Sequence, residues 1–257
     1  MFKEEENYYI IEEFKKFNIK AVYTKKNAGN MSDYCKGYND NLNTTQENNR
    51  FKILELLESK DKIQVQAFQT HTNNVVDIKA DTSEYLYREI DGFITKRKDV
   101  ALFTFYADCL PIFAYDKENE VIGVWHSGWQ GSYTEIMKSG IDLMKNNYNT
   151  NYENLLIALG IGISANNYEV GVEFYNHFVD KFGKNDERIE KSFIKSINGK
   201  YFFDNTEFNR ILAIKLGVKE NNIIISKENT WDEKFHSYRR EKEKSGRAAG
   251  IILFDNI

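Results

Sequence analysis

The fold of this chain is decided by the stretch LPIFAYDKENEVIGVWH, residues 110–126. Two apolar segments, 110–115 and 121–126, flank five polar residues, and this pattern predicts a β-hairpin. Pro111 is the only proline of the chain. Because proline cannot donate a hydrogen bond to a neighbouring strand, we expect an edge strand or a bulge at this position.

The register of this hairpin relates two side chains that can carry chemistry. If Glu118 and Asn119 form a two-residue turn, Cys109 lies opposite Gly128. His126 is then a diagonal neighbour of Cys109 on the same face, with the two backbones roughly 7–8 Å apart. A metal ion could join side chains at that separation.

Strands and helices are interspersed on both sides of the hairpin. Apolar or alternating segments predict further strands over residues 63–67, 75–78, 91–95, 100–106, 155–159, 223–225 and 248–254. Helical spacing and capping residues predict helices over residues 45–58, 132–146, 168–182 and 204–217. This order indicates an α/β class (α+β, with a mixed sheet), and the length of 257 residues favours a single domain over residues 1–257.

Composition argues against several classes of protein. The net charge is −4, with 35 basic and 39 acidic residues mixed along the chain, so there is no basic stripe that would bind nucleic acid. The segment 1–9 is acidic and polar, unlike a signal peptide, and no apolar run approaches the ~18 residues that span a bilayer. We expect a cytoplasmic protein with no nucleic-acid or membrane partner. Nothing in the sequence indicates its oligomeric state.

The chain has two cysteines, too few for a disulfide framework at this length. Cys35 has no activating neighbour and is predicted to be an inert thiol. Cys109 follows an apolar strand and lies two residues before Pro111, whose rigid kink favours an exposed sulfur. The functional thiol is therefore expected at Cys109.

Three side chains at the ends of predicted strands form the candidate catalytic site. These are His71 after the strand 63–67, Cys109 after the strand 100–106, and His126 at the end of the hairpin. Two imidazoles and one thiolate suit zinc, and three protein ligands leave a fourth position for water or substrate. Copper is a less favoured metal. The two remaining histidines are expected to be structural: His177 and His236.

Several short motifs resemble those of one family in kind and in order. They are QTH (69–71), DGFIT (91–95), ADCLP (107–111), HSGWQG (126–131), YEVG (168–171), FHSYRR (235–240) and GR (246–247). With these motifs the chain resembles, over most of its length, the YfiH-like proteins, which are also known as laccase-domain or polyphenol oxidase proteins and as purine nucleoside phosphorylases.

The resemblance implies a fold, a metal site and a reaction. The fold is shared with bacterial cytotoxic deamidases, and the implied zinc ligands are His71, Cys109 and His126. The implied reaction is phosphorolysis of adenosine, inosine, guanosine or methylthioadenosine, with adenosine deamination as an associated activity. The expected partners are therefore a small purine nucleoside and phosphate.

Three features depart from the family pattern. The segment 24–30 is only a loose version of the family's Arg-x-Gly-Gly segment, so no role is assigned there. Gln130 stands where the family usually has arginine, which removes a permanent cation that could pair with phosphate. The segment 164–167, Ser-Ala-Asn-Asn, replaces a Pro-Cys-Cys stretch, so the site would depend on Cys109 as its only thiol.

Five further residues are candidates for contacts with substrate or with the metal ligands. Asp108 could orient a ligand histidine or accept hydrogen bonds from backbone amides at a turn. Arg50, Gln130, Arg239 and Arg240 could face phosphate or nucleoside. The segment 160–162, Gly-Ile-Gly, lacks the third glycine of a dinucleotide motif, so no dinucleotide-binding residue is assigned.

Other functions remain open at this point. A metal-free hydrolase or deamidase could use Cys109 as nucleophile with His71 or His126 as base. A copper-binding phenol oxidase is disfavoured because four histidines are too few for several copper centres. A non-catalytic binding protein is the fourth alternative, and only the replacement at Gln130 favours it.

Overall fold

The computed structural model describes residues 1–33, 45–83 and 85–255, and Cys35 lies outside them. One mixed sheet has the strand order β1-β2-β3-β16-β8-β4-β6. Its strands are β1 (Phe2–Glu4), β2 (Tyr8–Ile11), β3 (Ile19–Thr24), β16 (Ala248–Phe254), β8 (Val100–Tyr106), β4 (Ile63–Phe68) and β6 (Leu86–Arg88). Strand β4 runs parallel to β8 and β6, and the other neighbours are antiparallel.

A second mixed sheet has the order β15-β11-β9-β10-β7-β5. Its strands are β15 (Ile223–Ile225), β11 (Leu155–Leu159), β9 (Leu110–Asp116), β10 (Val121–Ser127), β7 (Gly92–Thr95) and β5 (Val75–Asp77). The chain crosses between the two sheets several times. The crossing from β8 to β9 is only three residues long, and it contains Cys109.

Eight α-helices and five short 3-10 helices are found in the described residues. The α-helices are α1 (Glu12–Lys15), α2 (Gln46–Leu56), α3 (Trp129–Tyr133), α4 (Ile136–Tyr148), α5 (Val172–Phe182), α6 (Glu187–Ser192), α7 (Asn205–Lys215) and α8 (Tyr238–Glu241). The 3-10 helices are η1 (Lys26–Ala28), η2 (Tyr152–Asn154), η3 (Ala165–Asn167), η4 (Glu220–Asn222) and η5 (Lys242–Lys244). Within the described residues, no helix has the length and apolar character needed to cross a membrane.

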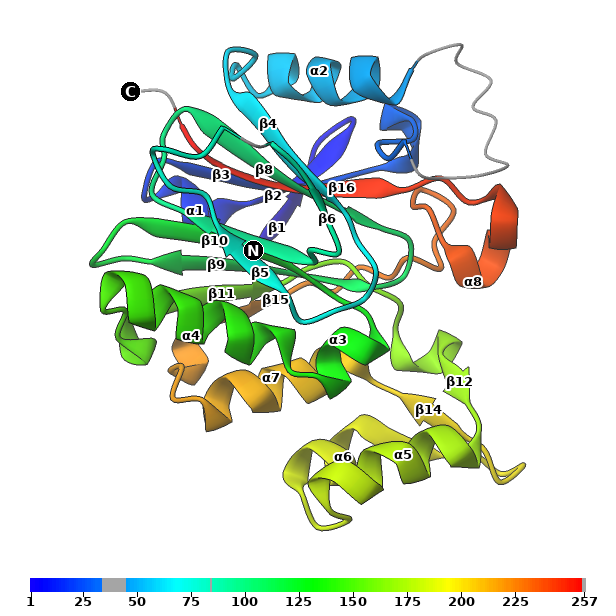
Figure 1. Ribbon diagram of the computed structural model, residues 1–257. Helices are drawn as coiled ribbons and strands as arrows, with labels where there is room; N and C mark the ends of the chain where they lie inside the picture. Colours follow the sequence, from blue (N-terminus) through cyan, green and yellow to red (C-terminus); the bar gives the residue numbers. More distant parts are fainter. Residues whose placement is uncertain (34–44, 84, 256–257) are drawn as a thin grey trace.

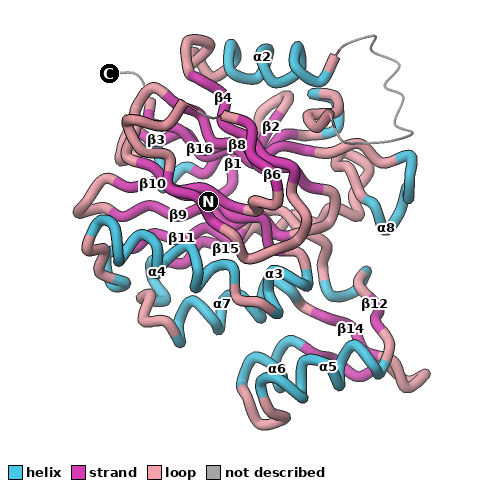
Figure 2. The backbone as a smooth tube through the Cα atoms, viewed as in Figure 1, coloured by secondary structure: helices cyan, strands magenta, loops and turns pink. Residues whose placement is uncertain are grey.

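The two sheets pack face to face between helical layers (Figures 1 and 2). Alternate residues of the central strands, such as Leu102 on β8 and Val124 on β10, meet in one buried cluster between the sheets. The opposite face of the second sheet packs against α4 and α7, and the opposite face of the first packs against α2. Because side chains alternate along a strand, His126 lies on the same inner face as Val124, at the open end of the core between the sheets.

A small aromatic lobe lies beside the second sheet (Figure 2). It consists of α5, α6 and a three-stranded sheet of β12 (Glu169–Val170), β14 (Tyr201–Phe203) and β13 (Phe193–Lys195). Its core includes Phe178, Phe193 and Phe203, and Trp129 and Tyr133 of α3 pack against it. The lobe therefore supports the short helix that follows His126.

The hairpin has the predicted register. Val121 pairs with Asp116 and Ser127 with Leu110, although four residues, 117–120, form the turn instead of two. The expectation about Pro111 is wrong, since β9 is a central strand with regular pairing. Pro111 lies one residue beyond the last pair of β9 with β11, which joins Ile112 to Leu159. Gly160 N still donates to Pro111 O at 2.8 Å, so the missing donor of Pro111 does not interrupt the ladder.

Most predicted elements are confirmed, but two helices are wrong in extent. The predicted helix 132–146 is divided into α3 and α4 by Glu135, whose φ is +59°. The predicted helix 168–182 begins only at Val172, because Glu169 and Val170 pair with β14. Helix α2 and helix α7 have the expected side-chain caps, Thr45 and Asp204.

Candidate metal centre

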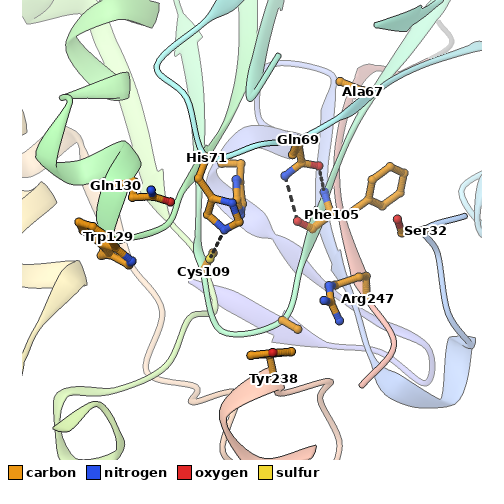
Figure 3. A pocket seen from close by; sticks show the side chains of 12 residues that line it. Ser32, Ala67, Gln69, His71, Phe105, Cys109, Trp129, Gln130, Tyr238 and Arg247 are labelled. Atoms are coloured by element: carbon orange, nitrogen blue, oxygen red, sulfur yellow. Dashed lines mark hydrogen bonds between the residues drawn. The ribbon is translucent and has the colours of Figure 1, made fainter. Parts of the chain in front are cut away.

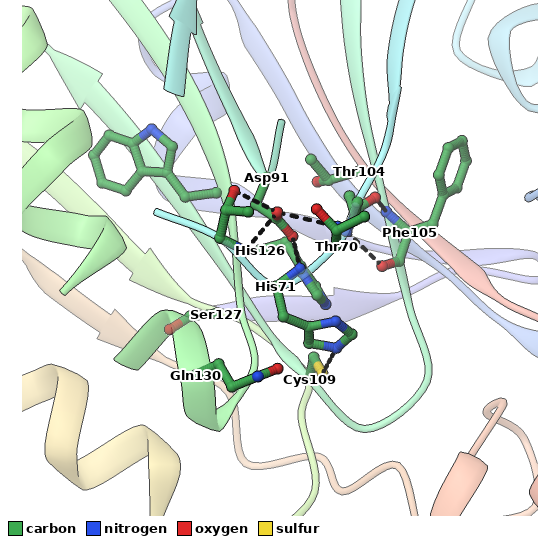
Figure 4. A network of polar contacts seen from close by, with 12 residues as sticks. Thr70, His71, Asp91, Thr104, Phe105, Cys109, His126, Ser127 and Gln130 are labelled. Atoms are coloured by element: carbon green, nitrogen blue, oxygen red, sulfur yellow. Dashed lines mark hydrogen bonds and ion pairs between the residues drawn. The ribbon is translucent and has the colours of Figure 1, made fainter. Parts of the chain in front are cut away.

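Three side chains from three segments meet at one edge of the two sheets (Figure 4). His71 lies in the loop after β4, Cys109 lies between β8 and β9, and His126 lies near the end of β10. One donor atom from each lies within 4.8 Å of the others, and Cys109 Sγ is 3.7 Å from His71 Nε2. In the described residues this is the one such group of histidine, cysteine or acidic side chains.

The three side chains differ in exposure, which leaves the group open on one side. His126 is 4% exposed, Cys109 is half-buried and His71 is exposed. The first two are held by the sheets, whereas His71 closes the group from a loop and has a φ of +63°. A left-handed backbone is costly for histidine, so its neighbours must hold it there.

Asp91 holds both histidines, and the sequence alone did not indicate this role. Its carboxylate is buried and accepts hydrogen bonds from the backbone nitrogens of Thr70, His71 and Thr72 and from Thr72 Oγ1, at 2.8–3.2 Å. It also contacts His126 Nδ1 at 2.8 Å. Although burial opposes ionisation, the contact with His126 keeps the pKa of Asp91 below its usual value. The only signal was an acidic residue directly before a buried strand.

The contact with Asp91 leaves the other ring nitrogen of His126 available. When the ring is neutral and Nδ1 carries the proton toward the carboxylate, Nε2 has a lone pair on the side of Cys109 and His71. A carboxylate behind a histidine is a common arrangement in metal centres, because it orients the ring and makes it a better ligand. The donor set therefore fits a metal ion that binds nitrogen and sulfur and keeps an open position.

The thiol and His126 favour each other's charged forms. Burial favours the neutral forms, but His126 with His71 lowers the pKa of Cys109 to about 6. Cys109 together with Asp91 correspondingly raises the pKa of His126 to about 9. A thiolate is thus accessible at neutral pH, and the thiolate is the form that binds metals or attacks electrophiles.

Gly128 leaves the space that this group needs. A Cβ atom on Gly128 would lie 2.9 Å from Cys109 Sγ and 2.8 Å from His71 Cδ2. Both distances are shorter than van der Waals contact, so any side chain here would displace a donor atom. This close approach agrees with the predicted pairing of Cys109 with Gly128.

Two cavities open on either side of His71 and Cys109. The first, of about 500 Å³, includes Gln69, Gln130 and Arg247 in its lining (Figure 3). The second, of about 280 Å³, is lined by aromatic residues such as Tyr168 and by Arg239. Both cavities border Trp129 and Tyr238.

Gln69 shapes the first cavity by replacing a strand partner. Its side chain donates to Phe105 O at 3.0 Å and accepts from Phe105 N at 2.6 Å (Figure 3). The amide thus continues the pairing of β4 with β8 where the two backbones separate. The separation makes room for the loop that carries His71.

The C-terminal segment forms the opposite side of both cavities, and we call Tyr238, Arg239, Lys242 and Arg247 the cationic wall. Five arginines of the described residues pair with carboxylates: Arg50, Arg97, Arg188, Arg210 and Arg240. Arg239 and Arg247 instead donate to backbone carbonyls, of Glu169 in one case and of Ser245 and Gly246 in the other. Their charges are therefore not neutralised by a carboxylate within the described part of the chain.

The remaining candidates are placed apart from one another. Asp108 accepts from Thr230 Oγ1 at 2.7 Å and from Arg239 N at 2.6 Å, so it bonds to a hydroxyl and a backbone amide and not to a histidine. The buried Arg50 donates to Met31 O at 2.6 Å and away from both cavities.

Arg240 and Gln130, from two different motifs, have different surroundings. Arg240 donates to the carbonyls of Thr230, Trp231 and Phe235 and holds its own loop together. Gln130 is exposed and lines the first cavity, in the position where a family arginine would add charge.

The other two histidines lie outside the candidate centre. His177 stacks on Tyr133, with ring centroids 4.1 Å apart. His236 is fully buried, with Nε2 3.4 Å from Gly29 O.

Comparisons with known proteins show the family and the fold of this chain. A purine nucleoside phosphorylase of Borreliella burgdorferi is 32% identical over 232 residues, covering 90% of this chain and 91% of the relative. A purine nucleoside phosphorylase of Bacteroides thetaiotaomicron is 28% identical over 88% of this chain and 86% of its own length. YlmD from Geobacillus stearothermophilus has the same fold, with a TM-score of 0.88, 22% identity and 99% coverage of both chains. The family model described as multi-copper polyphenol oxidoreductase laccase matches residues 20–255, and the chain belongs to that family.

Proposed function

We propose that this protein is a zinc-dependent purine nucleoside phosphorylase. The observation that carries the proposal is the open group of His71, Cys109 and His126, held by Asp91 between two cavities. The names of the relatives support the same reaction. Two imidazoles and a thiolate favour zinc over metals that prefer oxygen ligands.

The proposed substrates are phosphate and adenosine, inosine, guanosine or methylthioadenosine. In phosphorolysis an oxygen of hydrogen phosphate forms a bond to C1′ of the sugar while the bond from C1′ to the purine nitrogen breaks. The proton of hydrogen phosphate leaves with the base, so the products are the free purine and the sugar 1-phosphate. Arg247 lines the first cavity and Arg239 lines the second, and neither has a carboxylate partner among the described residues. These two arginines would therefore hold the phosphate.

The protein's own groups have distinct roles in this proposal. Bound zinc would act as a Lewis acid toward an oxygen or nitrogen of the substrate. Asp91 keeps His126 in one tautomer and holds the loop of His71, so the ligands need little reorganisation. The rings of Trp129 and Tyr168 provide apolar surface for a purine.

Adenosine deamination is a proposed associated activity of the same site. Water would add at C6 of the purine, and ammonia would leave from that carbon. A zinc ion held by His71, Cys109 and His126 would supply the Lewis acidity that activates this water. Deamination needs no phosphate, so omission of phosphate separates the two activities.

A metal-free thiolate hydrolase is the second candidate function. It is favoured by one observation, the lowering of the pKa of Cys109 to about 6 by the two histidines. A multicopper oxidase is less well supported, because the described residues bring together one group of three ligands and not several centres.

The test combines metal analysis with activity. Metal content is measured by mass spectrometry on protein purified without an affinity tag, for the wild type and for Cys109→Ala. Both are then incubated with adenosine or inosine, with and without phosphate. We expect near-stoichiometric zinc and phosphate-dependent release of free base in the wild type, and loss of both in the variant.

Other outcomes identify the alternatives. Wild-type protein without metal, whose Cys109 is rapidly alkylated, would favour the thiolate hydrolase. Copper with oxygen consumption on phenols would favour the oxidase. Stoichiometric zinc without turnover of any nucleoside would favour a binding protein.

A further inference from the structure

Asp108 has an unusual conformation and does not contact the candidate ligands. Its φ is +86°, a backbone region that residues with a side chain seldom adopt. It directly precedes Cys109, yet its carboxylate turns toward the C-terminal segment, where it accepts from Thr230 Oγ1 and from Arg239 N. Such strain persists only where surrounding contacts hold it.

These contacts join the Cys109 loop to the cationic wall. Thr230 is fully buried, and its nitrogen donates to Gly162 O at 3.1 Å. Asp108 O in turn accepts from Ile163 N at 2.9 Å. Through these bonds, the segment that leads into the cationic wall is fixed to the strand ends around Cys109.

The position of the Arg239 side chain follows from its backbone. The guanidinium lies 5.1 Å above the ring of Tyr168, and Nη2 is 3.3 Å from Glu169 O, at the edge of the second cavity. Asp108 binds the backbone nitrogen of Arg239 and not its guanidinium. The carboxylate therefore fixes where the cation lies without neutralising it.

We propose that Asp108 is a positioning residue that sets the place of the Arg239 guanidinium relative to Cys109, and thereby the affinity for an oxyanion substrate. Inorganic phosphate is the oxyanion under the proposed function, on which this inference rests. Because Asp108 joins the Cys109 loop to the cationic wall, it fixes the position of a bound anion relative to the metal ligands. Small displacements of a substrate can be costly in rate.

Thr230→Val tests the link between Asp108 and the C-terminal segment without a substitution in the Cys109 loop itself. The substitution removes the hydroxyl donor to Asp108 and keeps the backbone bond to Gly162. We expect KM for phosphate to rise about 3- to 10-fold, with kcat within about 2-fold of the wild type. Thr230→Ser, which keeps the hydroxyl, should keep the wild-type KM.

Two further measurements separate positioning from a general structural defect. After replacement of zinc by Co²⁺, the thiolate-to-cobalt absorption band of Thr230→Val should match that of the wild type. In an Arg239→Ala background, Thr230→Val should cause no additional change in KM, because the link then has no cation to place. A Thr230→Val effect that adds fully to that of Arg239→Ala would overturn the inference.

The proposed function and this inference fail in different ways. If the wild type releases no base from any purine nucleoside, the proposed function fails, and calorimetric titration with inorganic phosphate replaces KM as the measure of the link. If the wild type is active and Thr230→Val has unchanged KM for phosphate, the positioning role of Asp108 is wrong while the function stands. A changed cobalt band at unchanged KM would also contradict it.

Discussion

Two buried histidines, one among the candidate ligands and one in the C-terminal segment, show how surroundings decide the chemistry of one residue type. His126, among the candidate ligands, contacts the carboxylate of Asp91 and the thiol of Cys109, and its pKa rises to about 9 although burial opposes the charge. His236 begins the segment that carries the cationic wall, and its pKa falls to about 4. For His236, burial is the largest cause, and the nearby cations add to it.

The difference extends to the two sides of the site. The ligand side gathers its donors around one buried carboxylate, so its geometry is preorganised. The cationic wall has arginines held by backbone carbonyls, and their charge stays available for an anion. One side is suited to a metal ion and the other to an anionic substrate.

Gly128→Ala should break the ligand side most strongly. The new Cβ would lie within 3 Å of atoms of Cys109 and His71, so at least one donor must move. We expect zinc affinity and activity to fall on the order of 100-fold. Competition with a zinc-binding dye measures the affinity, and urea unfolding of the metal-free protein checks the fold. Unchanged zinc affinity would show that the three side chains are not the metal ligands.

Asp91→Asn should weaken the same side while keeping its shape. An amide presents a donor where the carboxylate accepts from His126 or from the loop of His71. Zinc affinity should fall by roughly 10- to 100-fold. Asp116→Asn is the matched control. Asp116 is also buried and accepts hydrogen bonds from the backbone nitrogens of Glu118 and Asn119, in the hairpin turn away from the candidate ligands. Equal losses in both variants would contradict a specific role for Asp91.

His236→Gln should change the pH dependence of stability. The pKa of His236 is about 4 in the folded protein against an ordinary value of 6.5, so the unfolded chain binds more protons between these values. Stability is therefore fully present above pH 6.5 and is lost as the pH falls toward 4. Between pH 7.5 and pH 5, the wild type should lose about 2 kcal/mol more unfolding free energy than His236→Gln in urea titrations. An identical loss would assign the pH dependence to other groups.

Gln130→Arg should add a positive charge to the first cavity, where Arg247 is the one arginine or lysine among the described lining residues. Gln130 is exposed at its rim, so an added guanidinium would be partly screened by water. We expect KM for phosphate to fall by about 2- to 5-fold, with zinc content unchanged. Unchanged kinetics would indicate that Arg239 and Arg247 already supply the charge that phosphate needs.

Local patterns were sufficient for much of the fold. The hairpin register followed from placing the centre of the turn at Glu118 and Asn119, midway between two apolar segments, and this centre is the one observed. The starts of helices α2 and α7 could be predicted from their capping residues, because each cap accepts a hydrogen bond from a backbone nitrogen only three residues later. The strands β2 and β3 carried no prediction. They pair with each other, and β3 also pairs with β16, which lies far along the chain.

The sequence by itself determined the hairpin, the mixed α/β class and the proximity of Cys109 to His126, because these depend on residues close together in the chain. Only the tertiary structure decided that Asp91 joins His71 to His126, and that Asp108 faces Thr230 and not a ligand. It also separated Arg239, which lines a cavity, from Arg240, which holds its own loop. The contacts of Asp91 and Asp108 join residues 19 to 131 positions apart, and no local period or cap encodes which distant backbone will come to lie beside a given side chain.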